Sequence, residues 1–164
     1  MNTACGVIRN EGFLSIAPNR AVSIEAEQIA EKESEIHSSF RTSISIGYYQ
    51  VAQSLLEVSK ECLKNNWDGY GAKPIDPRSI DEALKFALLL PTSIPFPEIS
   101  VDADGEVIFE WYKEPNKVFS VIVESDNRIV YAGLFNHDDK VNGTEYFGDE
   151  LPKTILDNLQ RLFS

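Results

Sequence analysis

The chain is poor in the residue types that usually carry metal or redox chemistry. It contains two cysteines and two histidines in 164 residues. Cys5 and Cys62 are too few for a disulfide framework or a structural zinc site, and Cys62 falls on the apolar side of a predicted helix, as a reduced core thiol does. His37 and His137 are far apart in the sequence, and neither has a second His or Cys at ligand spacing. The sequence therefore predicts no metal and no cofactor.

Long hydrophobic runs are also missing. No apolar stretch approaches the roughly 18–20 residues that a membrane span needs. The N-terminus lacks the basic region and apolar stretch of a secretory signal. With two cysteines and no such signal, the sequence predicts a cytoplasmic protein that does not engage a membrane. Its 43% hydrophobic and 25% charged residues are ordinary for a globular chain, and its length predicts a single domain over residues 1–164.

Positive charge is scarce. Fifteen basic residues face 26 acidic ones, which gives a net charge of −11. This balance opposes direct binding to a nucleic-acid backbone, because such binding depends on clustered Lys and Arg. Solubility alone is one explanation of the acidity, and a partner protein with a basic surface is the other.

Hydrophobic periodicity predicts helices over residues 23–91. The first, from Ser23 as N-cap to about residue 37, is rich in glutamate and has a thin apolar stripe, which places it at the periphery. A stronger helix is predicted over 45–66, and Asp76-Pro77 has the residues of a helix start. Residues 1–22 fit either a short strand or an irregular arm.

From Glu98 the apolar period changes to two, which indicates strands. Residues 98–135 predict a four-stranded antiparallel meander, with Asp104-Gly105 in its first hairpin turn. Residues 136–146 have the composition of a polar loop. A last helix is predicted over 149–163, with Asp149 as its cap and Pro152 in its first turn. The predicted class is α+β, with helices packed on one face of the sheet.

No motif indicates catalysis. Nucleophile elbows and glycine-rich phosphate loops are absent. The aspartates at 102–105 fit a hairpin turn better than a calcium loop, because the twelfth position of such a loop is Trp111 where a glutamate is required. The loop His137-Asp138-Asp139 is typical of a solvated turn rather than of a cation site. The sequence predicts no catalytic residue and favours a binding protein over an enzyme.

The run Trp67-Asp68-Gly69-Tyr70-Gly71 is the most distinctive stretch of the chain. Two aromatics, an acid and two glycines suit a shaped loop that presents rings to a partner. The structural alternative is that Trp67 packs into the core and Asp68 caps nearby amides. We take Trp67, Asp68 and Tyr70 as candidate partner-binding residues, together with Glu27 and Glu31 of the acidic helix.

The order of three motifs resembles a group of small bacterial proteins of unknown function. These motifs are the run from Asn66 to Ala72, the segment 104–111 with Asp-Gly-Glu and Phe-Glu-Trp, and Phe147-Gly148 before Leu151-Pro152. The resemblance covers roughly residues 60–160 and implies an accessory or mobile-element protein. It implies no activity and no catalytic residue.

Three functions remain open at this point. The first is an antitoxin-like or inhibitor-like module that binds a second protein. The second is a nucleic-acid mimic, such as a phage-type inhibitor of a defence nuclease, which requires carboxylates aligned on one face. The candidates are the acidic helix from Glu25 to Glu35 and the sheet positions Asp102, Asp104, Glu106, Glu110 and Glu114. The third is a small metal-dependent enzyme that uses the acidic loops.

Overall fold

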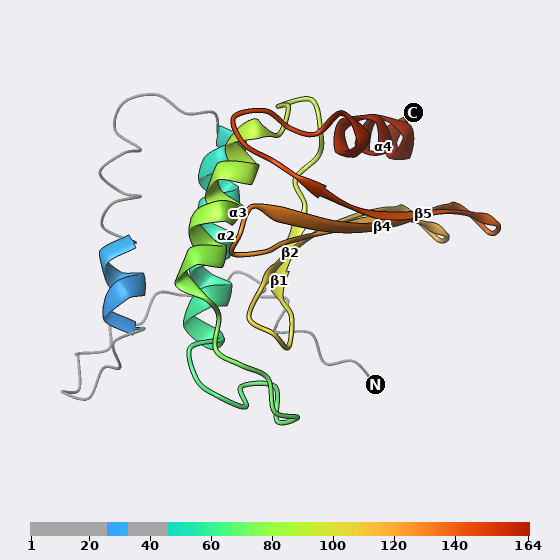
Figure 1. Cartoon of the computed structure of the whole chain (residues 1–164). Coiled ribbons are helices and arrows are strands. Elements are labelled where there is room, and N and C mark those ends of the chain that lie inside the picture. Colours follow the sequence, from blue (N-terminus) through green and yellow to red (C-terminus); the bar gives the residue numbers. More distant parts are fainter. Residues whose placement is uncertain (1–25, 33–45) are drawn as a thin grey trace.

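The computed structural model describes residues 26–32 and 46–164 (Figure 1). Residues 26–32 are helical, and the other elements follow in the order α2 (Ile46–Glu61), α3 (Pro77–Leu89), β1 (Glu98–Val101), β2 (Val107–Glu114), β3 (Lys117–Val123), β4 (Arg128–Asn136), β5 (Asp139–Tyr146) and α4 (Lys153–Phe163). The predicted α+β class is confirmed. No helix among the described residues is long and apolar enough to span a membrane.

The five strands form one antiparallel meander in sequence order, each strand pairing with the next. The prediction of four strands was therefore wrong by one, because the expected polar loop 136–146 contains β5. This strand lies at the edge of the sheet, and its residues alternate between exposed and partly buried. An edge strand with one solvated face has the polar composition of a loop, so composition alone does not reveal it.

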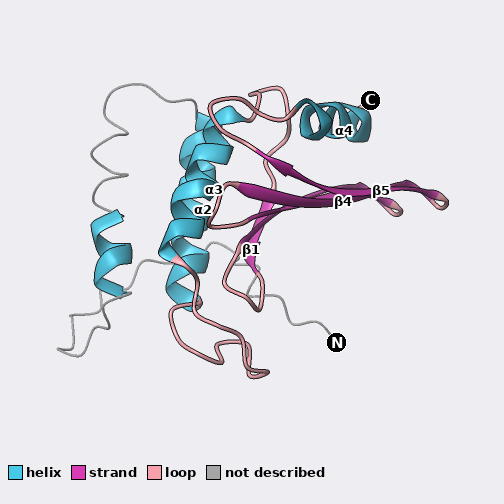
Figure 2. Ribbon diagram, in the orientation of Figure 1, coloured by secondary structure: helices cyan, strands magenta, loops and turns pink. Residues whose placement is uncertain are grey.

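The helices α2, α3 and α4 cover one face of the sheet (Figure 2). Helix α2 contacts β1, α3 contacts β2 and β3, and α4 contacts β3 and β4. The strand residues that point toward these helices are almost completely buried: Val107, Phe109, Trp111, Phe119, Val121, Val123 and Ile129. This side of the sheet is called the inner face below, and it forms the core with the apolar stripes of the helices.

Aromatic side chains connect the helical layer to the sheet. The ring centroids of Phe86 on α3 and Phe109 on β2 are 5.0 Å apart in an edge-to-face arrangement. Phe109 continues to Trp111 at 6.3 Å, and Trp111 to Phe119 at 6.4 Å. The Trp111 indole also donates to the Pro95 carbonyl at 2.8 Å, so this buried ring has its one polar atom satisfied.

Two helix boundaries differ from the sequence-based ones. Helix α2 ends at Glu61 and not at residue 66, and Asn66 adopts a positive φ of 62° that no helix accommodates. Helix α4 begins at Lys153, with Pro152 at the N-cap position and no side-chain cap, so Asp149 does not cap it. The cap of α3 is confirmed, because Asp76 accepts from the Arg78 amide at 2.9 Å.

Part of the predicted N-terminal helix is confirmed by the helical residues 26–32, in which Ile29 is buried. Its proposed cap Ser23, its C-terminal end at His37 and the arm at residues 1–22 lie outside the described residues. Cys62 is confirmed as a buried residue of the core.

The loop between α2 and α3 is fixed to the turn between β1 and β2. The amide of Lys73 donates to the Ala103 carbonyl at 2.9 Å, and that of Asp76 donates to the Gly105 carbonyl at 3.0 Å. Gly105 has a φ of 90°, and a Cβ at this position would lie 2.3 Å from the Pro74 carbonyl oxygen. The close approach of the two backbones therefore requires glycine here.

We predict that Gly105→Ala lowers the free energy of unfolding by about 3 kcal/mol, because it adds a backbone clash to an unfavourable φ. Gly69→Ala is the matched control, since Gly69 has a φ of 78° but no atom within 4 Å of the added Cβ. It should lose only about 1 kcal/mol. Urea denaturation followed by circular dichroism measures both, and equal losses would contradict the steric explanation.

Candidate functional site

The loop of residues 66–72 is held by hydrogen bonds within itself. Asn66 donates its amide to the Ala72 carbonyl at 2.7 Å and accepts the Gly71 amide on its side-chain oxygen at 2.7 Å. The indole of Trp67 donates to the Lys73 carbonyl at 2.8 Å, and its ring packs against the core. The two ends of the loop are thereby closed on each other, and Trp67 anchors the loop to the rest of the domain.

The carboxylate of Asp68 faces the backbone of its own loop. It accepts from the Tyr70 amide at 2.8 Å and from the Ala72 amide at 3.0 Å. These two backbone hydrogen bonds hold the pKa of Asp68 below its usual range, and the bond from the Tyr70 amide has the larger effect. The carboxylate therefore stays charged and serves as the loop's internal brace.

Tyr70 is the member of this loop that points into solvent. Its side chain is 81% exposed, the highest value among the large hydrophobic residues that the structure describes. It stands between Gly69 and Gly71, which both have positive φ angles of 78° and 101°. The sequence grouped three candidates in this loop; the structure gives Trp67 and Asp68 internal partners and leaves the Tyr70 ring outside.

Ion pairing extends the loop's attachment to the β1–β2 turn. The Lys73 ammonium lies 2.7 Å from the Asp104 carboxylate, and both side chains are exposed. Asp102 accepts from the amides of Asp104 and Glu106, each at 2.9 Å, which closes the turn. The Asp-Gly signal of a hairpin is thus confirmed, and its aspartates serve the turn and the loop beside it.

The candidates Glu27 and Glu31 lie on the helical residues 26–32, on a different part of the surface from the 66–72 loop (Figure 1). Both side chains are exposed. The structure therefore does not bring the two groups of predicted site residues into one cluster.

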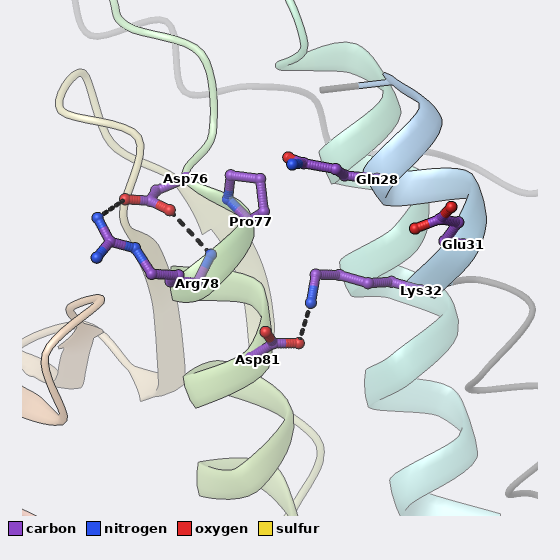
Figure 3. A pocket seen from close by; sticks show the side chains of 7 residues that line it. All are labelled: Gln28, Glu31, Lys32, Asp76, Pro77, Arg78 and Asp81. Carbon is purple, nitrogen blue, oxygen red and sulfur yellow. Dashed lines mark hydrogen bonds and ion pairs between the residues drawn. The ribbon is translucent and has the colours of Figure 1, made fainter. Parts of the chain in front are cut away.

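Glu31 lines a pocket of about 410 Å³ between the helical residues 26–32 and the start of α3 (Figure 3). The cationic side chains at its wall are paired with carboxylates: Lys32 with Asp81, and Arg78 with Asp76 at 3.5 Å. Since these positive charges are already compensated, the pocket has no strong preference for an anion.

Three polar residues at the junction of α3 with the sheet were not identified from the sequence. Ser79 is fully buried; its hydroxyl donates to the Val123 carbonyl at 2.9 Å and accepts the Val107 amide at 3.1 Å. Glu82 is also buried, and it pairs with Lys85 at 2.6 Å. The Asn127 amide faces Glu82, and with its nitrogen toward the carboxylate it donates at 2.6 Å. For Ser79 and Glu82, the signal that was available is their position among the apolar residues of α3, where polar residues need buried partners.

Glu106 is a partly buried carboxylate at this junction. Its Oε2 atom is buried and has no hydrogen-bond partner. Burial raises the pKa of Glu106, the Ser79 hydroxyl acts in the opposite direction, and the carboxylates of Asp76 and Asp102 add to the rise. Ionisation of Glu106 therefore costs the fold free energy.

The acidic loops do not assemble a metal site within the described residues, where no group of three or more His, Cys, Asp or Glu side chains is suited to hold an ion. His137 and Asp138 are exposed in the turn between β4 and β5. Asp139, which follows them, forms an ion pair with Arg161 of α4. This pair attaches the end of the hairpin to the last helix.

Comparison with known proteins finds no match among protein-family models, curated proteins or solved structures.

We predict that Glu106→Gln stabilises the protein at pH 7. The folded-state pKa is raised, so ionisation of Glu106 opposes folding above that pKa, and this penalty disappears as the pH falls toward the unfolded value of 4.5. The variant should therefore have a higher thermal midpoint at pH 7 and lose this advantage at about pH 4. Glu150→Gln, at an exposed position, is the control and should change neither midpoint. A lower midpoint for Glu106→Gln at pH 7 would show that the charge is favourable.

Proposed function

We propose that this protein is a protein-binding module and that Tyr70 is at the centre of its contact. The main support for this proposal is that the Tyr70 ring is 81% exposed on a loop closed by internal hydrogen bonds. Tyrosine supplies a large contact area with few rotatable bonds and is enriched among residues that dominate binding energy. A loop whose backbone is already fixed loses little entropy on binding, which favours affinity.

Charge supports a partner with a basic surface. The chain carries a net charge of −11, and Glu27 and Glu31 are exposed. Complementary charge accelerates encounter and rejects unsuited partners. A small acidic protein of this kind would cover a basic functional surface on a second protein, in the manner of an antitoxin or an inhibitor.

The nucleic-acid mimic receives less support, because the acidic positions of the sheet have partners inside the domain. Asp102 holds its turn, Asp104 pairs with Lys73 and Glu114 with Lys117 at 2.6 Å. Glu110 accepts from the Ser120 hydroxyl at 2.6 Å, and one oxygen of Glu106 is buried. A mimic needs carboxylates that are free to replace phosphates, and these are mostly engaged.

We predict that Tyr70→Ala removes the partner without destabilising the protein. The exposed ring contributes to binding, whereas the internal hydrogen bonds of the loop involve the backbone of Tyr70 and not its ring. Purification of the tagged full chain from its native host, with quantitative mass spectrometry of co-purifying proteins, measures the loss. We expect at least a tenfold reduction of one stoichiometric protein.

Tyr146→Ala is the matched control for this experiment, because Tyr146 is 68% exposed at the end of β5, away from the loop. It should retain the partner. Thermal midpoints of both variants should equal that of the wild type. Retention of the partner by Tyr70→Ala, or equal loss in the two variants, would overturn the assignment of the contact to this loop.

A further inference from the structure

The face of the sheet opposite the three helices carries an apolar surface of its own. In the central strands the register brings Ile108, Ile122 and Val130 into one row across β2, β3 and β4. A second row contains Tyr112, Val118 and Leu134. We call these six residues the outer patch. All of them are partly or largely exposed, and Tyr112 is 64% exposed.

The sequence of the central strand β3 is that of a strand covered on both sides. An antiparallel sheet with one solvated face alternates apolar and polar residues, whereas a sheet with two covered faces has continuous apolar runs. After Lys117, strand β3 contains one polar residue, Ser120. Its other residues are apolar on both faces: Val118 and Ile122 on the outer face, and Phe119, Val121 and Val123 on the inner face. Each of the described helices α2, α3 and α4 packs on the inner face, so none of them covers the outer patch.

Carboxylates and a lysine lie on opposite sides of the outer face, and Glu110 stands within the patch, between Ile108 and Tyr112 of β2. Glu98 of β1 and Glu110 of β2 are direct cross-strand partners and both are exposed, an arrangement of like charges that is unfavourable on its own. At the opposite edge, Lys140 of β5 is exposed and pairs in register with Leu134. Among the residues that the structure describes, neither Glu98 nor Lys140 has an ion-pair partner.

We propose that the outer patch binds a second copy of this chain, sheet against sheet. A twofold axis parallel to the strands and passing over β3 would place β2 of one copy over β4 of the other and β1 over β5. This operation puts Tyr112 against Leu134 of the second copy and Ile108 against its Val130, so apolar residues meet apolar residues. It also brings Lys140 of each copy to the β1 edge of the other, two residues along the strand from Glu98, which itself lies opposite Asn142 of the second copy. The interface is isologous and closed, as in most homodimers.

The size of the face sets the strength of this association. Five strands spaced about 4.8 Å apart and about 7 residues long give a face of roughly 450 Å² for each copy. Two such faces bury about 900 Å², which is at the small end of specific interfaces. We therefore expect a reversible dimer with a dissociation constant in the micromolar range rather than an obligate one.

Sedimentation equilibrium of the full chain over a wide concentration range tests the dimer. The wild type should show a monomer–dimer equilibrium, and Ile122→Lys should be monomeric at every concentration, because two lysines would meet near the axis. The thermal midpoint of Ile122→Lys checks that the domain still folds. A wild type that is monomeric at every concentration would overturn the proposal and leave the face to another protein or to another part of the chain.

A charge exchange tests the geometry even if Ile122→Lys does not fold. Glu98→Lys alone and Lys140→Glu alone each place like charges near each other at both symmetric edges, two residues apart along the strands, so each variant should dimerise about two- to threefold more weakly than the wild type. An equimolar mixture restores opposite charges in both contacts, and fluorescence-detected sedimentation with one labelled copy should show a mixed dimer of near wild-type affinity.

The charge exchange separates specific pairing from the effect of net charge. The two variants carry −9 and −13, since each exchange changes the wild-type charge of −11 by two, and their sum equals that of two wild-type copies. General repulsion would strengthen the Glu98→Lys homodimer, whereas specific pairing weakens it. A mixture no tighter than either variant alone would refute the proposed axis. The proposal is independent of the Tyr70 contact, because Tyr70→Ala should leave the dimer unchanged.

Discussion

The attachment of the α2–α3 loop to the β1–β2 turn is the constraint on which the rest of the structure depends. Lys73 and Asp76 donate to carbonyls of that turn, and the backbone of Pro74 passes so close to Gly105 that no side chain fits between them. A few residues later, the buried hydroxyl of Ser79 links the start of β2 to the end of β3. These contacts fix the position of the N-terminal end of α3 relative to strands β2 and β3. Because α3 carries Phe86, they also determine where the aromatic core begins, since this ring packs edge to face on Phe109.

The same constraint explains why the conspicuous loop residues have different roles. A loop that must close on itself and dock on a neighbouring turn needs its polar groups for its own backbone, and Asp68 and the Trp67 indole supply them. What such a loop can offer to a partner is the side chain that its closure does not use, which is the Tyr70 ring. Structural and functional explanations of the motif are therefore compatible: Asn66, Trp67 and Asp68 hold the backbone of the loop, and the Tyr70 ring lies outside it.

Sequence patterns among neighbouring residues predicted much of this fold, whereas the features that were missed depend on contacts between residues far apart in the sequence. The apolar periodicity of α3, the Asp76-Pro77 start and the Asp-Gly hairpin are determined by neighbouring residues, and a reader of the sequence finds them. Strand β5 was not recognisable, because it is an edge strand whose identity depends on pairing with β4. Nor could the sequence separate Tyr70 from Trp67 as the exposed ring, since their difference arises from the 2.8 Å contact between the indole and Lys73. Burial of Ser79 and Glu82 likewise follows from tertiary packing.

The outer patch is a different kind of feature, because the core does not require it. The inner face is complete without it: Val107, Phe109, Phe119, Val121 and Val123 have no exposed surface under the three helices. Polar side chains at positions 108, 122 and 130 would leave those contacts unchanged and would improve the solvation of the monomer. Exposed apolar area of this extent destabilises nothing in the isolated domain, yet it favours association. In a chain with a net charge of −11, the proposed dimer would cover this apolar surface, whereas general charge repulsion would oppose contact elsewhere.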